Sequence, residues 1–276
     1  MSIANAAHCS MMLGAGSPTP PGPAYWGLCF TAEEPNVVVN MTKTGSPPAV
    51  TLETSTDGLN WTSFDADGGT TPITLANVGD KVLFRAGSGG NAQMASSLTA
   101  RYVFTLSGPC AASGKITSLL DAASENAPIT ASYAFYRLFY NCPLTTAPEL
   151  PSTQISSSCY RAMFQGCTRL VTAPALPATA LETYCYNQMF RGCSSLTTAP
   201  VLPATVLPGY CYQAMFTGCA NLNRLEVHFN TWNSTTSWVS GVSATGTFYC
   251  PAALGTNETI ERGVSKCPAG WTVINI

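Results

Sequence analysis

The chain has 276 residues, of which only 9% are charged, and its formal net charge is −2. Typical soluble domains carry about 25% charged residues, so this surface must be formed largely by Ser, Thr, Asn and Gly, which suits neutral polar partners such as sugars or protein subunits. The 12 Lys and Arg against 14 Asp and Glu leave no basic stripe for phosphates, and we expect no nucleic-acid partner. No apolar run approaches the roughly 18 residues of a membrane helix, so no membrane span is expected.

Residues 1–24 are predicted to form an irregular arm or linker, because they end in the proline-rich run SPTPPGP. The segment lacks the basic residues of a secretory signal, and His8, Cys9 and Ser10 interrupt its apolar stretch. If Met1 is the native start, the protein is made in a reducing compartment, although a chain whose signal had been removed would look the same. The arm either docks on a neighbouring subunit or is an unstructured tail.

Residues 25–115 are predicted to form a small antiparallel β-sandwich-like module. Short apolar and β-branched runs alternate there with turn residues such as Asp57-Gly58, a pattern typical of closely spaced strands. The expected strands are WGLCF (26–30), VVVNM (37–41), VTLETS (50–55), WTSF (61–64), PITL (72–75), KVLFRAG (81–87) and RYVFTLS (101–107).

Residues 116–229 contain an internal repeat with a period of 26 residues. The copies are CYRAMFQGC (159–167), CYNQMFRGC (185–193) and CYQAMFTGC (211–219), and residues 132–142 are a degenerate first copy. A leucine phrase of the type LTTAPxLP follows at Leu144, Leu170 and Leu196, and after the last copy it changes to LNRLEVHF (222–229). Such a period with leucine at a fixed phase predicts a leucine-rich-repeat solenoid. Residues 230–276 are then expected to cap the exposed end of its core.

Each repeat is predicted to contain one short helix and one short parallel strand. Tyr160, Met163, Phe164 and Cys167 stand at i, i+3, i+4 and i+7, the spacing of one stripe of a helix. A glycine before the last cysteine fits a left-handed helix stop: Gly166, Gly192 and Gly218. The predicted fold class is therefore α+β, a β-sandwich-like module followed by a solenoid and a C-terminal cap.

Seven of the 12 cysteines occupy two fixed phases of the repeat: Cys142, Cys159, Cys167, Cys185, Cys193, Cys211 and Cys219. Each phase is an interior slot of a stack, where a free thiol behaves as a small buried hydrophobe. This favours structural thiols over disulfides or a metal site. The chain has no C-x-x-C pair and only two histidines, so we expect no metal or cofactor.

No catalytic constellation stands out, and we expect no enzyme activity. His8 lies in the arm and His228 stands between Val227 and Phe229, so neither is placed to activate a thiol; no spacing singles out a carboxylate pair. The tyrosines at 160, 186 and 212 share the apolar stripe and are expected at the core edge. Recognition is better sought where otherwise fixed copies differ: Arg161, Asn187 and Gln213; Gln165, Arg191 and Thr217; and Arg169, Ser195 and Asn221.

The CYxxMFxGC and LTTAPxLP phrases resemble BspA-type leucine-rich repeats, found in surface proteins of anaerobic gut bacteria and in structural proteins of their phages. The resemblance is strong over 132–229 and looser in STDGLNW (55–61), VGDKVLFRAG (78–87), GTFYC and GWTVI. It implies a non-enzymatic virion protein, a fibre or capsid-decorating subunit that contacts host or mucosal glycans. Its arm and β module would attach to other virion proteins or to a second copy.

Two other hypotheses remain open from the sequence. A bacterial cell-surface adhesin of the same repeat type would carry the same phrases. A cysteine-dependent hydrolase would require one exposed thiol of low pKa.

Overall fold

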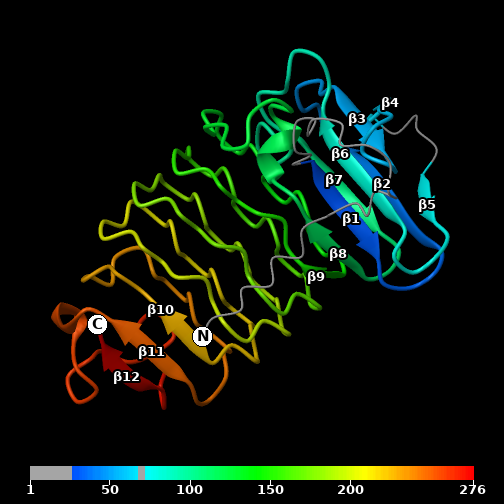
Figure 1. The fold of residues 1–276 in the computed structure, drawn as a ribbon. Coiled ribbons are helices and arrows are strands. Elements are labelled where there is room, and N and C mark those ends of the chain that lie inside the picture. The colour runs from blue at the N-terminus through cyan, green and yellow to red at the C-terminus, as the bar shows by residue number, and fades with distance from the viewer. Residues whose placement is uncertain (1–26, 68–71) are drawn as a thin grey trace, which may run out of the picture.

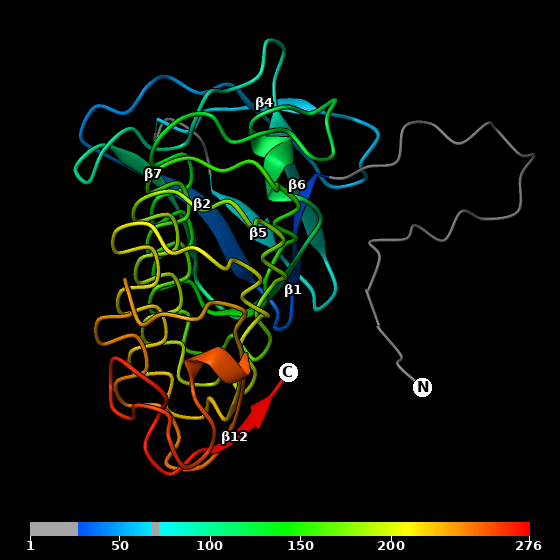
Figure 2. The same ribbon diagram turned by 90° about the vertical axis from the view of Figure 1, so that its left-hand side faces the viewer.

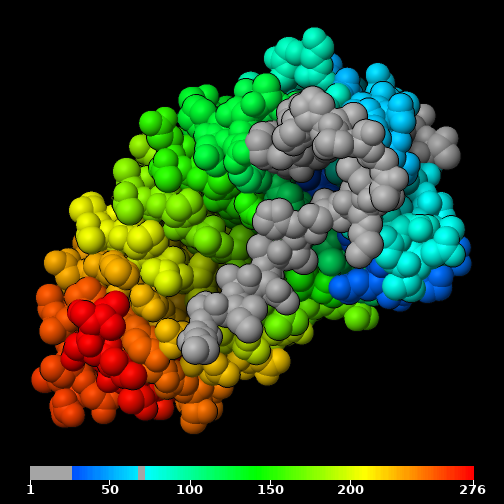
Figure 3. Space-filling view, viewed as in Figure 1, coloured from blue at the N-terminus to red at the C-terminus, as the bar shows by residue number. Residues whose placement is uncertain are grey.

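The computed structural model describes residues 27–67 and 72–276, so the predicted arm at 1–24 lies outside the described residues. The N-terminal β module lies at one end, the repeats form the middle and a small C-terminal sheet lies at the other end (Figure 1). In the space-filling view the colours follow one another as bands, so the copies are stacked in sequence order (Figure 3).

Each of the seven strands expected in the N-terminal module is present. They are β1 (Leu28–Ala32), β2 (Val37–Thr44), β3 (Leu52–Ser55), β4 (Thr62–Phe64), β5 (Ile73–Leu75), β6 (Lys81–Ala86) and β7 (Arg101–Leu106), and β8 (Cys110–Ser113) follows. The first five side chains of β2 alternate between buried and half-buried, as a strand with one face on a core requires, and its last three are exposed. The strands form two sheets, ordered β4-β3-β6-β1-β8-β9 and β5-β2-β7.

The predicted α+β class with a helix in each leucine-rich repeat is wrong. The described residues contain no α-helix: apart from the short 3-10 helices η1 (Ile116–Leu119) and η2 (Ala252–Leu254), they form strands and turns arranged in three sheets. The segment expected to be helical, residues 159–167, is a succession of tight turns. The molecule is therefore nearly all-β, and the helix-and-strand solenoid is not formed.

Hydrogen bonding between copies explains why the helix does not form. Along residues 158–167 the backbone N–H groups alternate: one donates to the carbonyl three residues back, as Met163 does to Tyr160, and the next donates to the following copy, as Phe164 does to Met189. Every fourth residue is left-handed, at φ 57° for Ser158, 52° for Ala162 and 79° for Gly166. Gly166 thus has the predicted positive φ, but it lies in a chain of turns and not at a helix end.

The leucine phrases stack as a narrow parallel ladder. β9 (Leu144–Thr146) pairs with β8, and single bridges link Thr146, Thr172, Thr198 and Arg224 in turn. The ladder continues beyond residue 229 through β10 (Arg224–Glu226), β11 (Thr247–Cys250) and β12 (Thr272–Asn275), which pair in parallel. The segment expected to act as a cap therefore contains two more rungs. The view turned by 90° shows the chain piled up as successive loops below the β module (Figure 2).

An aromatic column runs through the core from the β module to the C-terminal region. The ring centroids of Phe139 and Phe164 are 5.5 Å apart, those of Phe164 and Phe190 5.6 Å, and those of Phe190 and Phe216 5.7 Å, all with nearly parallel planes. Phe104 of β7 stacks on the first of these rings at 5.8 Å. The β module and the repeats consequently share one continuous hydrophobic core.

Candidate functional site

The outward side of the turn segments is a surface that repeats from copy to copy. We call the outward side of residues 133–141, 158–166, 184–192 and 210–218 the turn face. In each copy adjacent pairs of side chains are buried every four residues, as with Cys159-Tyr160 and Met163-Phe164. The residues between these pairs are mostly half-buried or exposed, although some, such as Ala162 and Asn187, are buried. The turn face therefore presents residues at equal phases of successive copies beside one another.

Six of the variable positions predicted for recognition form two columns on the turn face. The first column consists of Arg161, Asn187 and Gln213, and the second of Gln165, Arg191 and Thr217. Backbone hydrogen bonds between copies align the first column, from Ala162 to Asn187 and from Gln188 to Gln213. Equivalent bonds align the second column, from Gly166 to Arg191 and from Gly192 to Thr217. Most of these side chains are partly or fully exposed, but Asn187 is fully buried.

The third variable set lies outside the turn face. Arg169, Ser195 and Asn221 follow the last cysteine of each copy, at the corner before the leucine phrase. Arg169 and Asn221 are exposed, whereas Ser195 is half-buried and its backbone N–H donates to the Thr168 carbonyl at 3.2 Å. The structure therefore groups six of the nine candidates and leaves three apart.

Tyrosines that sequence reasoning did not select add an aromatic platform to the turn face. The rings of Tyr184 and Tyr210 stack with centroids 4.9 Å apart and planes 10° from parallel, and Tyr210 is 49% exposed. The Arg161 guanidinium lies 5.1 Å from the centre of the Tyr184 ring. Both tyrosines directly precede the CYxxMFxGC phrase, but the preceding copy has Ser158 at this phase, so the column is incomplete in the sequence.

A second group of cations and rings covers the first copy. The Arg137 guanidinium lies 4.6 Å from the centre of the Tyr140 ring and 5.4 Å from that of Tyr136, and Arg101 of β7 lies 5.7 Å from Tyr136. An arginine held flat against a ring retains its charge and has a less mobile stem. The turn face therefore combines cations with tyrosine rings over several copies.

One buried amide lies within the first variable column. The Asn187 amide nitrogen donates to Gln213 Oε1 at 2.9 Å, whereas Asn187 Oδ1 has no hydrogen-bond partner among the described residues. Gln165 Oε1 is likewise buried without a partner in the described part of the chain. Unpaired buried acceptors cost free energy, and they retain the capacity to accept a hydrogen bond.

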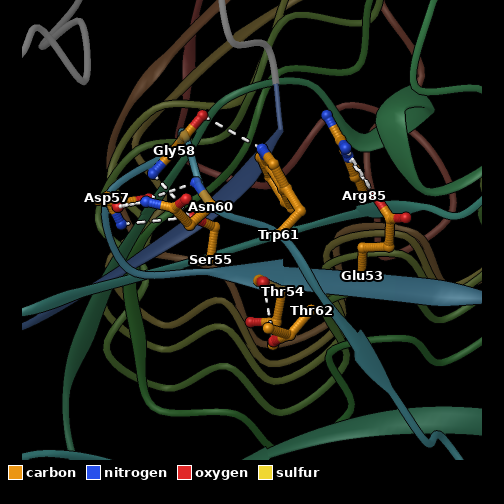
Figure 4. A network of polar contacts seen from close by, with 9 residues as sticks. All are labelled: Glu53, Thr54, Ser55, Asp57, Gly58, Asn60, Trp61, Thr62 and Arg85. Atoms are coloured by element: carbon orange, nitrogen blue, oxygen red, sulfur yellow. Dashed lines mark hydrogen bonds and ion pairs between the residues drawn. The ribbon is translucent and has the colours of Figure 1, made fainter.

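The loop STDGLNW between β3 and β4 carries a polar network instead of an open site (Figure 4). The Asp57 carboxylate accepts from the Asn60 backbone N–H at 2.8 Å, the Leu59 N–H at 2.8 Å and the Ser55 hydroxyl at 2.9 Å. These bonds, that from the Asn60 backbone first, hold the pKa of Asp57 well below its usual range. The carboxylate thus shapes the loop.

An ion pair and a ring lie beside this loop. Arg85 donates through Nε to Glu53 Oε2 at 2.7 Å, and its guanidinium lies 4.0 Å from the centre of the Trp61 ring (Figure 4). A shallow hollow of about 290 Å³ lies close by, lined by Thr54, Asp57 and their neighbours. Because Arg85 is neutralised by Glu53 and Asp57 is saturated by its own loop, this hollow is a weaker candidate than the turn face.

Among residues 27–67 and 72–276 the ladder cysteines offer no reactive thiol. The 11 cysteines in the described part of the chain are all free and buried, including the seven ladder cysteines. Burial raises the pKa of Cys142, Cys159, Cys211 and Cys219 to about 12 and raises that of the other three ladder thiols well above the usual value. Such thiols are almost entirely protonated at neutral pH and are poor nucleophiles.

Four ladder thiols each donate one hydrogen bond to the carbonyl of a phenylalanine in the preceding layer, at 3.0–3.1 Å. Cys167, Cys193 and Cys219 donate to Phe139, Phe164 and Phe190 of the preceding copies, and Cys142 donates to Phe104 of β7. This contact gives the invariant cysteine a structural role that an aliphatic side chain of similar size would lack.

The remaining chemistry-bearing groups of the described residues do not assemble into a site. His228 Nε2 lies 3.5 Å from Glu226 Oε1 near β10, where both side chains are partly exposed. Within 27–67 and 72–276, no group of three or more His, Cys, Asp or Glu could hold a metal ion. No helix in the same ranges is long and apolar enough to cross a membrane.

Comparison of the chain with protein-family models, with curated proteins and with solved structures gave no match.

Proposed function

We propose that this protein is a non-enzymatic structural subunit of a phage virion, a fibre or capsid-decorating protein, and that its turn face adheres to host or mucosal glycans. The observation that carries the glycan-binding part is the aromatic platform of Tyr184 and Tyr210 beside Arg161. Tyrosine rings pack on the apolar faces of sugar rings, and arginine and amide side chains bond to hydroxyl groups.

The regular spacing of the turn face supports a polymeric ligand. Parallel neighbouring rungs lie about 4.8 Å apart, so equivalent side chains recur along the stack at a fixed interval. A continuous core holds them in place, which reduces the ordering cost of binding. Several copies of the protein on one particle would add avidity to weak individual contacts.

Glycan adhesion is tested by binding of the purified protein to immobilised mucin, measured by biolayer interferometry. Replacing Tyr210 by alanine should weaken binding about ten-fold, because a lost ring contact is worth roughly 1–2 kcal/mol. Val206, which is 74% exposed and lies outside the turn face, provides the control substitution Val206→Ala. Equal binding by both variants and the parent, or no binding to mucin at all, would remove the proposed role of the turn face.

The virion location rests on the resemblance of the repeat phrases and is tested separately. Mass spectrometry of purified particles should detect this chain at a fixed ratio to the major capsid protein. Its absence from particles together with its presence on bacterial surfaces would favour the adhesin hypothesis instead.

A further inference from the structure

We infer that the turn face selects acidic glycans, polysaccharides carrying carboxylate or sulfate groups, and that Arg161 and Arg191 bind the anions. This inference rests on the proposed glycan-binding function and names the chemical class of the ligand.

The charged residues of the turn segments are all positive. The turn segments contain three arginines, Arg137, Arg161 and Arg191, and no Asp or Glu, although the whole chain has a net charge of −2. None of these three arginines forms an ion pair with a carboxylate in the part of the chain that the structure describes. An external anion can therefore bind them without displacing an internal partner.

The position of Arg161 joins a cation to the sugar-stacking platform. Its guanidinium lies 5.1 Å from the Tyr184 ring, which in turn stacks on Tyr210. Arg161 comes from the copy before Tyr184 and Tyr210 from the copy after it. A polymer that packs one sugar ring on Tyr210 and runs along the stack past Tyr184 would bring an acidic group of another sugar to the guanidinium. Contact with the ring limits the motion of the arginine stem, so less freedom is lost when the anion binds.

Arg191 places a second cation on the same face, one copy further along the stack. It is exposed, and it occupies the column next to the one that holds Arg161 and Asn187. Two cations at different rungs match a polymer in which acidic groups recur along the chain.

A series of dextrans tests the inference, because its members share one backbone and differ only in charge. Binding of the full chain to neutral dextran, carboxymethyl dextran and dextran sulfate is measured by biolayer interferometry at several salt concentrations. We expect both acidic polymers to bind at least ten-fold more tightly than neutral dextran, and to weaken as salt rises.

Charge-removing variants locate the binding surface. Arg161→Gln and Arg191→Gln should each weaken binding to the acidic dextrans about ten-fold. Arg161→Lys, which keeps the charge but loses the planar contact with Tyr184, should weaken it less. The control Arg224→Gln removes the same charge on the parallel ladder, where Arg224 lies 3.6 Å from Glu226, and should bind like the parent. Thermal unfolding of every variant confirms that the fold is retained.

Failure of this inference differs from failure of the proposed function. If mucin binds equally before and after enzymatic removal of its sialic acid and sulfate, the anion selectivity is wrong and glycan binding stands. If neither mucin nor any dextran binds, the proposed function fails as well. Equal weakening by Arg224→Gln, or equally tight binding to polyglutamate, which has charge but no sugar ring, would show attraction to polyanions and overturn the inference.

Discussion

At the scale of single residues, the turn face depends on left-handed backbone at every fourth position. In the second full copy these positions are Tyr184, Gln188 and Gly192, with φ of 59°, 58° and 78°. A residue that has a Cβ atom is less stable by about 1–2 kcal/mol in the left-handed conformation, because its Cβ approaches the following carbonyl oxygen. The non-glycine residues tolerate the cost because turn bonds and bonds between copies fix the backbone on both sides.

Replacing Gly192 by alanine should therefore destabilise the protein by about 1–2 kcal/mol. Apart from its chain neighbours, no atom would lie closer than 3.7 Å to the added Cβ, so steric overlap does not contribute. The measured loss is the backbone strain less the small gain from restricting the unfolded chain. Equilibrium urea denaturation measures the change in the free energy of unfolding.

Gly209 provides the matched control. It does not have a positive φ, and a Cβ there would meet only the Thr183 side chain at 3.6 Å, an ordinary contact. Gly209→Ala should leave stability unchanged or raise it by up to about 1 kcal/mol, because alanine restricts the unfolded chain. Equal destabilisation by both substitutions would contradict the strain argument.

The sequence revealed part of this surface, and the reason is visible in particular residues. Differences between copies pointed to Arg161, Gln165 and Arg191, which the structure places on the turn face. The platform of Tyr184 and Tyr210 was missed because its phase holds serine in the preceding copy. Two adjacent copies have tyrosine at this phase, and the pair could be recognised as a platform only when the structure showed that the two rings stack.

At the scale of elements, the turn segment shows why one apolar pattern allowed two structures. The spacing of Tyr160, Met163, Phe164 and Cys167 fits a helical stripe, but it equally fits buried pairs recurring every four residues, with Cys159 beside Tyr160. A helix this short is marginal by itself. The neighbouring copies supply carbonyl acceptors for alternate N–H groups, and those bonds replace the helical ones. The strands of the N-terminal module pair with partners even farther away in the sequence, as Leu28 does with Phe84. Their short apolar and β-branched runs between turn residues fit a strand and no second structure, so the sequence located all seven.

The aromatic column should be the most sensitive element of the core. Phe190 is fully buried and stacks on Phe164 and Phe216, so Phe190→Ala removes two ring contacts and leaves a cavity. We expect a loss of about 3–5 kcal/mol in the free energy of unfolding. The exposed Val206→Ala should change it by less than about 0.5 kcal/mol. Chemical denaturation followed by tryptophan fluorescence compares the two, and a loss below 1 kcal/mol at Phe190 would mean that the column is loosely packed.

At the scale of the whole molecule, the β module and the repeats are joined by backbone bonds as well as by the core. The backbone N–H of Phe104 in β7 donates to the Leu138 carbonyl at 2.9 Å, and that of Ile116 donates to the Glu149 carbonyl at 3.0 Å. The thiol of Cys142 donates to the Phe104 carbonyl at 3.0 Å. The first copy is therefore built directly on the edge of the β module.

This continuity predicts one cooperative unfolding transition. Circular dichroism and fluorescence should report the same midpoint on heating, because neither the β module nor the repeats can expose its end of the shared core alone. Phe104→Leu, made in the β module, should shift the whole transition downward without splitting it. Two resolved transitions would mean that the modules unfold independently.

The buried thiols make the stability of the whole molecule sensitive to alkaline pH. In the unfolded chain a thiol ionises near its ordinary pKa of 9.0, whereas burial raises the pKa of Cys142, Cys159 and Cys219 to about 12 in the folded protein. The folded state therefore favours the protonated thiol, and this contribution is fully present below pH 9 and is lost as pH rises toward 12. Each buried thiol should lower the free energy of unfolding by about 1.4 kcal/mol per pH unit across that window.

Urea denaturation between pH 7 and 11 measures this loss of stability. Cys159→Ala should lower stability at pH 7, and it should also reduce the slope of the free energy of unfolding against pH by the contribution of one thiol. A slope unchanged by that substitution would show that the alkaline loss arises elsewhere, for example from the buried tyrosines, whose pKa values burial also raises.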